Sequence, residues 1–320
     1  VESQDSYILY FIENDEEKLL NQLGELVEDA ILLRTKNCAH QYGTFVSGGV
    51  DSALVACIAK PDYIYTAHYD YDDFDELAYA KLVAKQINKE LVIVSPDKED
   101  FQNTREEIAW HLDTPCTWTS FTLWHLVKCA AKQNVKVILS GDGADEMFAG
   151  YHRYHLLHHD ELIHNLEAMK QYGYMIDKYY GSPVERYVRL VNRNDNRFDE
   201  AVNTYLNETI SSYFDKSDND IVHSMGINDF YSTMQVLLQM ADRLNMAFHV
   251  ENRAPFLDYR LVQFAFSMPS EYKIRNGVTK WALKEVSKKI IPNEISARID
   301  KRGFSAPVNK WFNWEKQGKY

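Results

Sequence analysis

The stretch FVSGGVDSALVACIAK, residues 45–60, decides the predicted fold. An apolar run stops at Val46, a serine and two glycines follow, and an apolar helical pattern resumes after Asp51. Glycines at such a turn let backbone N–H groups approach an anion closely, and the N-terminal end of the next helix attracts negative charge. The stretch therefore predicts a strand, a phosphate-binding loop and a helix in succession.

The chain around this loop alternates between strand-like and helix-like periodicity. That alternation is typical of an α/β fold in which helices cover a parallel sheet on both faces. After about residue 150 the pattern becomes mostly helical, and we expect no strand there. We predict a nucleotide-binding α/β region at 1–150 and a mainly helical substrate or closing region at 151–320, within one continuous domain. The predicted strands are 43–46, 63–67, 91–94 and 135–139, and the predicted helices are 14–37, 51 onward, 75–88 and 121–133.

A second glycine loop, SGDGADE at 140–146, follows the predicted strand 135–139. Two strands therefore each end in a loop that contains Ser-Gly and leads into a helix. Ligands of open α/β sheets bind at the carboxyl ends of the strands. We expect the two loops to line one crevice.

The composition excludes several classes of protein. The chain of 320 residues has 35 lysines and arginines against 47 acidic residues, a net charge of −12 that disfavours non-specific binding to nucleic acid or anionic membranes. No apolar segment approaches the roughly 18 to 20 residues that span a bilayer, and the first residues do not resemble a secretory leader. The four cysteines lack the C-x-x-C spacing of a zinc site. We expect a soluble, cytoplasmic protein without nucleic-acid or membrane partners.

The polar residues of the first loop suit a phosphate and a metal ion. Ser47 and Ser52 can donate hydrogen bonds to phosphate oxygens, whereas the carboxylate of Asp51 cannot. A carboxylate beside a phosphate needs a cation between them, and Mg²⁺ prefers oxygen ligands of this kind. The loop has neither the G-x-x-x-x-G-K-[ST] pattern nor the G-x-G-x-x-G pattern. A bare pair of glycines is more often structural, but the complete S-G-G-V-D-S between a strand and a helix favours binding.

Four motifs together resemble one family. SGGVDS resembles the pyrophosphate-binding loop of the ATP pyrophosphatase (PP-loop) superfamily, whose members split ATP between its α and β phosphates. SGDGADEMFAGYHRY (140–154) resembles the second motif of asparagine synthetases. The segments ADRLNMAFHVENRAPFLDYRLVQFAFSMPSEYKIRNGVTK (241–280) and RIDKRGFSAPVNKWF (298–312) resemble their helical region and their lysine-bearing loop. The resemblance extends from about residue 15 to residue 312.

The resemblance implies that ATP is bound by both loops. Lys301 and Lys280 match two lysines that face the phosphates, and Asp142 matches the acid that holds the substrate and takes a proton from the attacking amine. Positioned ammonium groups stabilise the charge that develops on departing pyrophosphate. Asp51 and Asp145 match the carboxylates that bind Mg²⁺. The implied nucleotide-binding residues are Ser47, Gly48, Gly49, Asp51, Ser52, Gly141 and Glu76.

The implied reaction is the adenylation of an aspartate-like carboxylate, with release of pyrophosphate, followed by attack of an amine to give an amide and AMP. Glutamine-using members carry a glutaminase domain with an N-terminal cysteine, whereas residue 1 here is Val and no cysteine precedes Cys38. The nitrogen is therefore expected from ammonia, a separate glutaminase subunit or an amine on the substrate. The last case matches the β-lactam synthetases and lasso-peptide cyclases, which use this activation to close a ring on a natural product or peptide; a sugar acid is a further candidate substrate.

A non-catalytic nucleotide-binding partner of a glutaminase is a third alternative, and a homodimer is compatible with the sequence. Five histidines between 152 and 164 favour a polar helix face over a metal site. The acidic stretch 70–76 favours a loop that leads into a helix, and 95–100 is predicted to be a polar loop. Arg153 fits a substrate carboxylate and a helix surface equally well.

Overall fold

The structure is a computed structural model, and the protein is described at residues 15–36, 38–71, 76–154, 182–191, 200–214, 220–298 and 306–312. The chain forms two compact units that interleave along the sequence. The predicted division at residue 150 into a nucleotide-binding and a closing region stays a prediction. The sheet unit comprises Leu20–Asp142, Val236–Leu261 and Lys284–Tyr320, and the helical unit comprises Val1–Leu19, Gly143–Gln235 and Val262–Leu283.

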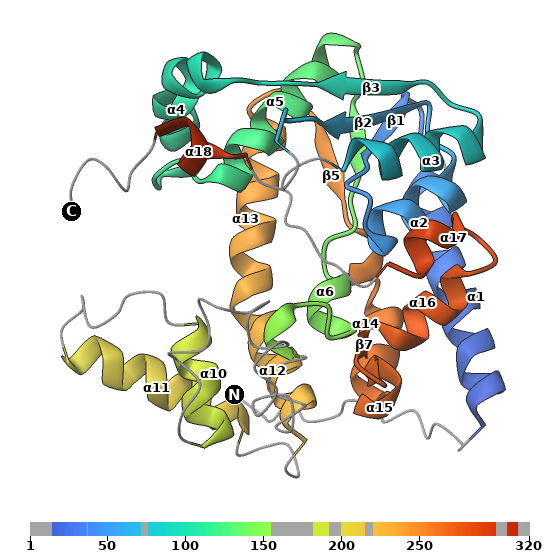
Figure 1. Cartoon of the computed structure of the whole chain (residues 1–320), viewed down its shortest axis with the longest axis vertical. Helices are drawn as coiled ribbons and strands as arrows, with labels where there is room; N and C mark the ends of the chain where they lie inside the picture. Colours follow the sequence, from blue (N-terminus) through green and yellow to red (C-terminus); the bar gives the residue numbers. More distant parts are fainter. Residues whose placement is uncertain are drawn as a thin grey trace. The chain divides into compact units, whose positions relative to one another are not determined.

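The sheet unit is built on five parallel strands, in the order β3-β2-β1-β4-β5 (Figure 1). Along the chain the strands progress outward from β1 to β3 and then return to the other side of β1. Gly43 accordingly faces Tyr63 of β2 on one side and Ile138 of β4 on the other. This reversal is the switch point at which open α/β sheets bind ligands. The strands are β1 (Tyr42–Phe45), β2 (Tyr63–Ala67), β3 (Leu91–Val94), β4 (Val137–Leu139) and β5 (Glu251–Arg253).

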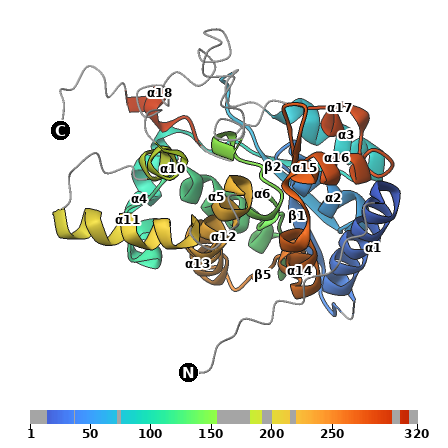
Figure 2. The ribbon, with the colours of Figure 1, turned by 90° about the horizontal axis from the view of Figure 1, so that it is seen from below.

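Helices cover both faces of this sheet, which confirms the predicted fold class. Figures 1 and 2 show α2 and α3 on one side of the strands and α4 and α5 on the other. The apolar residues of α5 pack on the sheet in a buried cluster that includes Tyr65, Leu126, Val127 and Ile138. The helices that lie within the sheet unit are α2 (Val50–Ala59), α3 (Leu77–Ile87), α4 (Lys98–Leu112), α5 (Trp118–Lys132), the short 3₁₀ helix η3 (Pro255–Leu257), α17 (Asn293–Ser296) and α18 (Val308–Phe312).

Two elements of the sheet unit differ from the prediction. The stretch 95–100 is not entirely a loop, because α4 begins at Lys98. Asp97 caps this helix by accepting from the Asp100 N–H, while the Asp100 side chain accepts from the Asp97 N–H. Such reciprocal capping stabilises a helix start.

The expectation of no strand after residue 150 is also wrong. The short strand β5 pairs with β4, with Val137 opposite Glu251 and Leu139 opposite Arg253. Its three residues, Glu-Asn-Arg, carry no apolar alternation, so backbone pairing alone marks the strand.

The helical unit has its own buried cluster, formed by Ala149, Tyr154, Tyr187, Val222, Met225 and Ile274. Among the helices that the structure describes, none has the length and apolar character required to cross a bilayer. The unit contains α6 (Ala144–Met147), α10 (Pro183–Val191), α11 (Glu200–Phe214), α12 (Ile221–Tyr231), α15 (Ser270–Lys273), β6 (Ile274–Arg275) and β7 (Val278–Thr279). The helices α1 (Glu16–Thr35), α13 (Thr233–Met246), α14 (Tyr259–Ser267) and α16 (Trp281–Ser287) each contribute residues to both units.

Candidate functional site

The first glycine loop joins β1 to α2 in a conformation that requires glycine. Gly48 has a φ of +69°, and a Cβ at this position would stand 2.8 Å from the Tyr79 Cβ. Gly49 is the N-cap residue of α2, and its carbonyl accepts from the Ala53 N–H at 3.1 Å. The loop therefore places its backbone at the start of a ten-residue helix. Anions bind favourably at such a position.

Two serines fix the shape of this loop. The Ser52 hydroxyl accepts from the Ser47 N–H at 3.2 Å and donates to the Gly49 carbonyl at 3.3 Å. The hydroxyl oxygens of Ser47 and Ser52 are 3.4 Å apart. Both hydroxyls are thus held at the N-terminus of α2.

The second glycine loop lies directly against the first. A Cβ on Gly141 would stand 2.9 Å from the Asp51 Cβ and 3.3 Å from the Ser52 nitrogen. Ser140, which precedes it, donates its hydroxyl to Asp142 Oδ2 at 2.8 Å. The sheet unit thus brings together most of the predicted nucleotide-binding residues: Ser47, Gly48, Gly49, Asp51, Ser52 and Gly141.

Glu76, the remaining predicted binding residue, forms an ion pair that the sequence analysis did not anticipate. Arg298 Nη1 lies 2.7 Å from Glu76 Oε1, and the two side chains are only 6% and 9% exposed. The same nitrogen donates to the Gly48 carbonyl at 3.1 Å, and the guanidinium lies 4.3 Å from the centre of the Tyr79 ring. Arg298 opens the motif RIDKRGF, and that place in the motif is the one signal that could have drawn attention to it.

In the helical unit, Asp145 and Lys280 form a second ion pair. Lys280 Nζ lies 2.7 Å from Asp145 Oδ1, and the lysine side chain is 9% exposed. The pair is enclosed by Gly150, because a Cβ there would stand 1.9 Å from Asp145 Oδ1 and 2.1 Å from Lys280 Cε. Lys280 is therefore a buried cation and not a solvated surface charge.

Glu146, which follows Asp145 in the sequence, is also buried, and its carboxylate accepts a hydrogen bond from the Tyr151 hydroxyl at 2.5 Å. Burial, together with the charge of the neighbouring Asp145, raises the pKa of Glu146 to about 7. Glu146 is thus a buried carboxyl adjacent to Asp145 whose protonated form is favoured by its surroundings.

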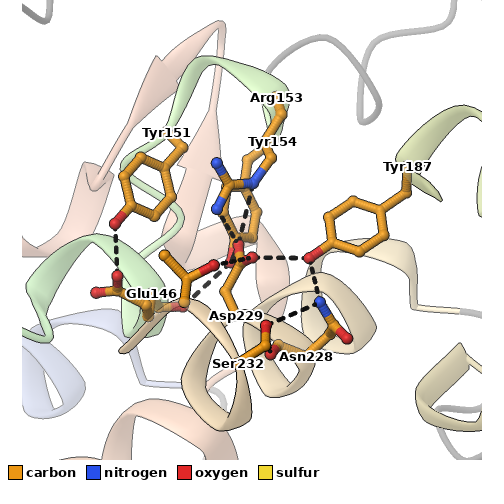
Figure 3. A network of polar contacts seen from close by, with 9 residues as sticks. Glu146, Tyr151, Arg153, Tyr154, Tyr187, Asn228, Asp229 and Ser232 are labelled. Carbon is orange, nitrogen blue, oxygen red and sulfur yellow. Dashed lines mark hydrogen bonds and ion pairs between the residues drawn. The ribbon is translucent and has the colours of Figure 1, made fainter. Parts of the chain in front are cut away.

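Arg153 belongs to a buried polar network centred on Asp229 (Figure 3). Arg153 Nη2 lies 2.8 Å from Asp229 Oδ2, and the hydroxyls of Tyr154 and Tyr187 each donate to Asp229 at 2.7 Å. The Tyr187 oxygen in turn accepts from the Asn228 amide. Arg153 is thus an internal ion-pair partner and not a solvated helix-surface residue.

Several residues singled out in the sequence lie outside the part of the chain that the structure describes. These are Lys301, the aspartates 72, 73 and 75 of the acidic stretch, and His155, His158, His159 and His164. Within the described ranges, no three His, Cys, Asp or Glu side chains gather to hold a metal ion.

The sheet order and the two glycine loops define an open parallel α/β fold with two loops placed where such sheets bind ligands. The family model described as asparagine synthase matches residues 22–319, and the chain belongs to this family. The resemblance seen in the four motifs is thereby confirmed.

The chain is similar to several named relatives. It is 28% identical to asparagine synthetase [glutamine-hydrolyzing] 1 of Bacillus subtilis (strain 168), over 95% of this chain and 52% of that protein. It is 29% identical to a putative asparagine synthetase [glutamine-hydrolyzing] of Mycobacterium tuberculosis (strain ATCC 25618 / H37Rv), over 84% of this chain and 45% of that protein. Amidase chyE of Penicillium rubens is 22% identical over 92% of this chain and 53% of its own length. The chain spans about half the length of these relatives.

Proposed function

We propose that the protein is an ATP-dependent, AMP-forming ligase that activates an aspartate-like carboxylate and transfers ammonia or an amine to it. The observation that carries the proposal is the contact of Gly141 with Asp51, which places two glycine loops around one helix N-terminus. A carboxylate does not accept an amine directly, because its leaving group would be oxide. Adenylation makes AMP the leaving group, so a site that holds ATP by its phosphates suits this chemistry.

The first loop is proposed to hold the β and γ phosphates. The Ser47 and Ser52 hydroxyls and the backbone at Gly48 and Gly49 are the donors, and the start of α2 adds a favourable dipole. Asp51 fits a magnesium ion, because it offers carboxylate oxygens beside the proposed phosphate position.

The family motif assigns a second carboxylate, Asp145, to this ion, and that assignment stays a proposal. When bound, Mg²⁺ would neutralise charge on the departing pyrophosphate.

The catalytic residues are proposed to be Lys280, Lys301 and Asp142. Lys280 supplies a buried ammonium group, and such a group in a dry site stabilises developing negative charge. Asp142, held by the Ser140 hydroxyl, is proposed to accept a proton from the attacking amine. Lys301 is assigned from the sequence motif alone.

The test is acid-dependent exchange of labelled pyrophosphate into ATP, with Mg²⁺ and a series of amino and sugar acids. Exchange reports adenylation before the nitrogen donor is known. The Asp51→Asn variant keeps the side-chain shape and removes the charge, so its exchange should fall about 100-fold or more. A folded protein that binds ATP but exchanges with none of the acids would contradict the proposal. The same screen with ammonia, followed by mass spectrometry of the product, separates amide formation from ring closure.

A further inference from the structure

A buried arginine contacts the backbone of the phosphate loop. The Arg298 Nη1 atom donates both to the Gly48 carbonyl, at 3.1 Å, and to Glu76 Oε1, at 2.7 Å. Both partners are far from Arg298 in the sequence, since Gly48 is 250 positions away and Glu76 is 222 positions away. Burial of a guanidinium costs free energy unless the group is paired, and here Glu76 and the Gly48 carbonyl are its partners.

We propose that Arg298 is a positioning residue that sets the orientation of the Gly48–Gly49 peptide, with Glu76 holding the guanidinium in place. This inference rests on the proposed function, because the peptide matters only if the loop binds phosphate.

Peptide geometry gives the step from Arg298 to the ligand. A trans peptide is planar, so its C=O and N–H groups point in opposite directions. The described residues contain no cis peptide bond. When Arg298 holds the Gly48 carbonyl on one side, the Gly49 N–H must point to the other side, away from the guanidinium. Arg298 thereby aims a donor without touching the ligand itself.

The loop needs such a restraint because of its glycines. Two successive residues without a Cβ have access to backbone conformations that other residues avoid, so the peptide between them can rotate at low cost. Gly48 already has a positive φ of +69°. A charge-assisted hydrogen bond from Arg298 selects one orientation of that peptide.

Arg298 is itself held from three directions. Glu76 pairs with the guanidinium, the Tyr79 ring lies 4.3 Å from its centre, and Lys284 Nζ donates to the Arg298 carbonyl at 2.8 Å. Glu76 and Tyr79 lie at the start of α3, and Lys284 lies in α16. The guanidinium is therefore fixed by its side chain and by its backbone, as a positioning residue requires.

The test compares Arg298→Met, Arg298→Lys and Glu76→Gln by equilibrium binding of ATP and of inorganic pyrophosphate. We expect Arg298→Met to lower the affinity for ATP and for pyrophosphate by about tenfold or more. That is the effect of losing one charge-assisted hydrogen bond. Arg298→Lys keeps the cation but not the planar fork, so it should restore part of the affinity. The affinity of Glu76→Gln for ATP and pyrophosphate should lie between that of the wild type and that of Arg298→Met. The double variant should be no weaker than Arg298→Met alone, because the two residues act as one unit.

A purely structural role would give a different pattern. In acid-dependent exchange, Arg298→Met should raise the KM for ATP and leave the KM for the acid within about twofold, whereas a general loss of structure would change both. Arg260→Met is the matched control, since Arg260 is also an ion-paired arginine of the sheet unit, with Asp258 and Asp29 as partners. It should leave ATP binding unchanged.

Unchanged ATP and pyrophosphate binding in Arg298→Met and Glu76→Gln would overturn the inference. If Arg298→Met does not fold, unchanged binding in Arg298→Lys and Glu76→Gln has the same meaning. A wild type that binds ATP but shows no acid-dependent exchange would instead contradict the proposed function, and the binding comparison would still decide the role of Arg298.

Discussion

Gly141 lies so close to Asp51 that a methyl group on Gly141 would stand 2.9 Å from the Asp51 Cβ. The nearest atoms are a Cβ and backbone atoms, which cannot turn aside as the end of a long side chain can. We expect Gly141→Ala to lower the free energy of unfolding by about 1–3 kcal/mol, because one loop must move. Acid-dependent exchange should fall about 100-fold, since a shift near 1 Å is enough for that loss. Urea denaturation and the exchange assay measure the two effects.

Gly24→Ala is the matched control for this substitution. A Cβ on Gly24 meets only a methyl group of Val286, at 3.4 Å, and the residue lies inside α1. Alanine there should stabilise the protein by about 0.5–1 kcal/mol and leave exchange unaltered. Equal exchange in the Gly141→Ala variant and the wild type would show that the contact between the loops is unimportant for the reaction.

The Asp145–Lys280 pair predicts a large effect of removing one charge. In Lys280→Met, a partly buried carboxylate loses its 2.7 Å partner. The free energy of unfolding should fall by about 3 kcal/mol, as is typical when one member of a buried pair is removed. Exchange should fall about 100-fold or more if Lys280 also stabilises the transition state.

The control for this experiment is Lys288→Met, which breaks the exposed pair with Glu285. An exposed pair contributes at most about 1 kcal/mol, so both readouts should stay near wild type. The prediction fails if Lys280→Met and Lys288→Met have the same free energy of unfolding and the same rate of exchange.

The Asp229 network predicts a ranking of stability losses. Asp229→Ala leaves the Arg153 guanidinium without its buried counter-charge and removes the acceptor of two tyrosine hydroxyls. We expect the free energy of unfolding of Asp229→Ala to fall by about 3–5 kcal/mol. Tyr187→Phe removes one hydroxyl and should cost about 1–2 kcal/mol. Chemical denaturation measures both values, and Tyr205→Phe, on a side chain that is 67% exposed, serves as the control. A loss below about 1 kcal/mol for Asp229→Ala would show that the network contributes little.

Lys273 predicts a pH dependence of stability. Its side chain is buried, and its ammonium nitrogen has no hydrogen-bond partner among the described residues. Burial lowers the pKa of Lys273 to about 8, although the negative charge of Asp220 opposes the shift. Below pH 8 the Lys273 ammonium group is therefore charged in the folded protein, and burial of this charge lowers the free energy of unfolding. Between about pH 8 and pH 10.4 the folded state releases this proton while the unfolded chain keeps it, so the contribution of Lys273 to stability rises with pH.

The substitution Lys273→Met removes that titration. The variant should gain stability relative to the wild type at pH 7, and this relative gain should shrink by about 3 kcal/mol as the pH rises above 10. Urea denaturation at a series of pH values measures the difference, with the exposed Lys289→Met as the control. A difference that does not change with pH would show that Lys273 does not titrate in this range in the folded protein.

The local parts of the fold were predictable from the sequence because they depend on local patterns. The strand predicted at 43–46 is found at Tyr42–Phe45, and the strands at 63–67 and 91–94 are found where they were predicted. The two glycine loops were predictable for the same reason, since glycines between an apolar strand and a helix form a short-range signal.

The remaining features depend on contacts that no local pattern encodes. The strand β5 has three polar residues, and only its pairing with Val137–Leu139 makes it a strand. Arg298 donates a hydrogen bond to the first glycine loop, at Gly48, across 250 positions of sequence. The pair of Arg298 with Glu76 joins residues 222 positions apart, so no local pattern around Glu76 shows it.

The pairing of β4 with residues 251–253 has a consequence for the order in which the protein is made. The sheet cannot be completed on the ribosome until residue 253 has been synthesised, long after both glycine loops. Val308 and Trp311, which pack with Phe101 and Phe121, emerge later still. Folding must therefore wait for long-range pairing, which is intrinsically slow and leaves strand edges exposed to aggregation. A recombinant fragment that ends near residue 150 would carry both glycine loops and yet lack the edge strand that covers β4.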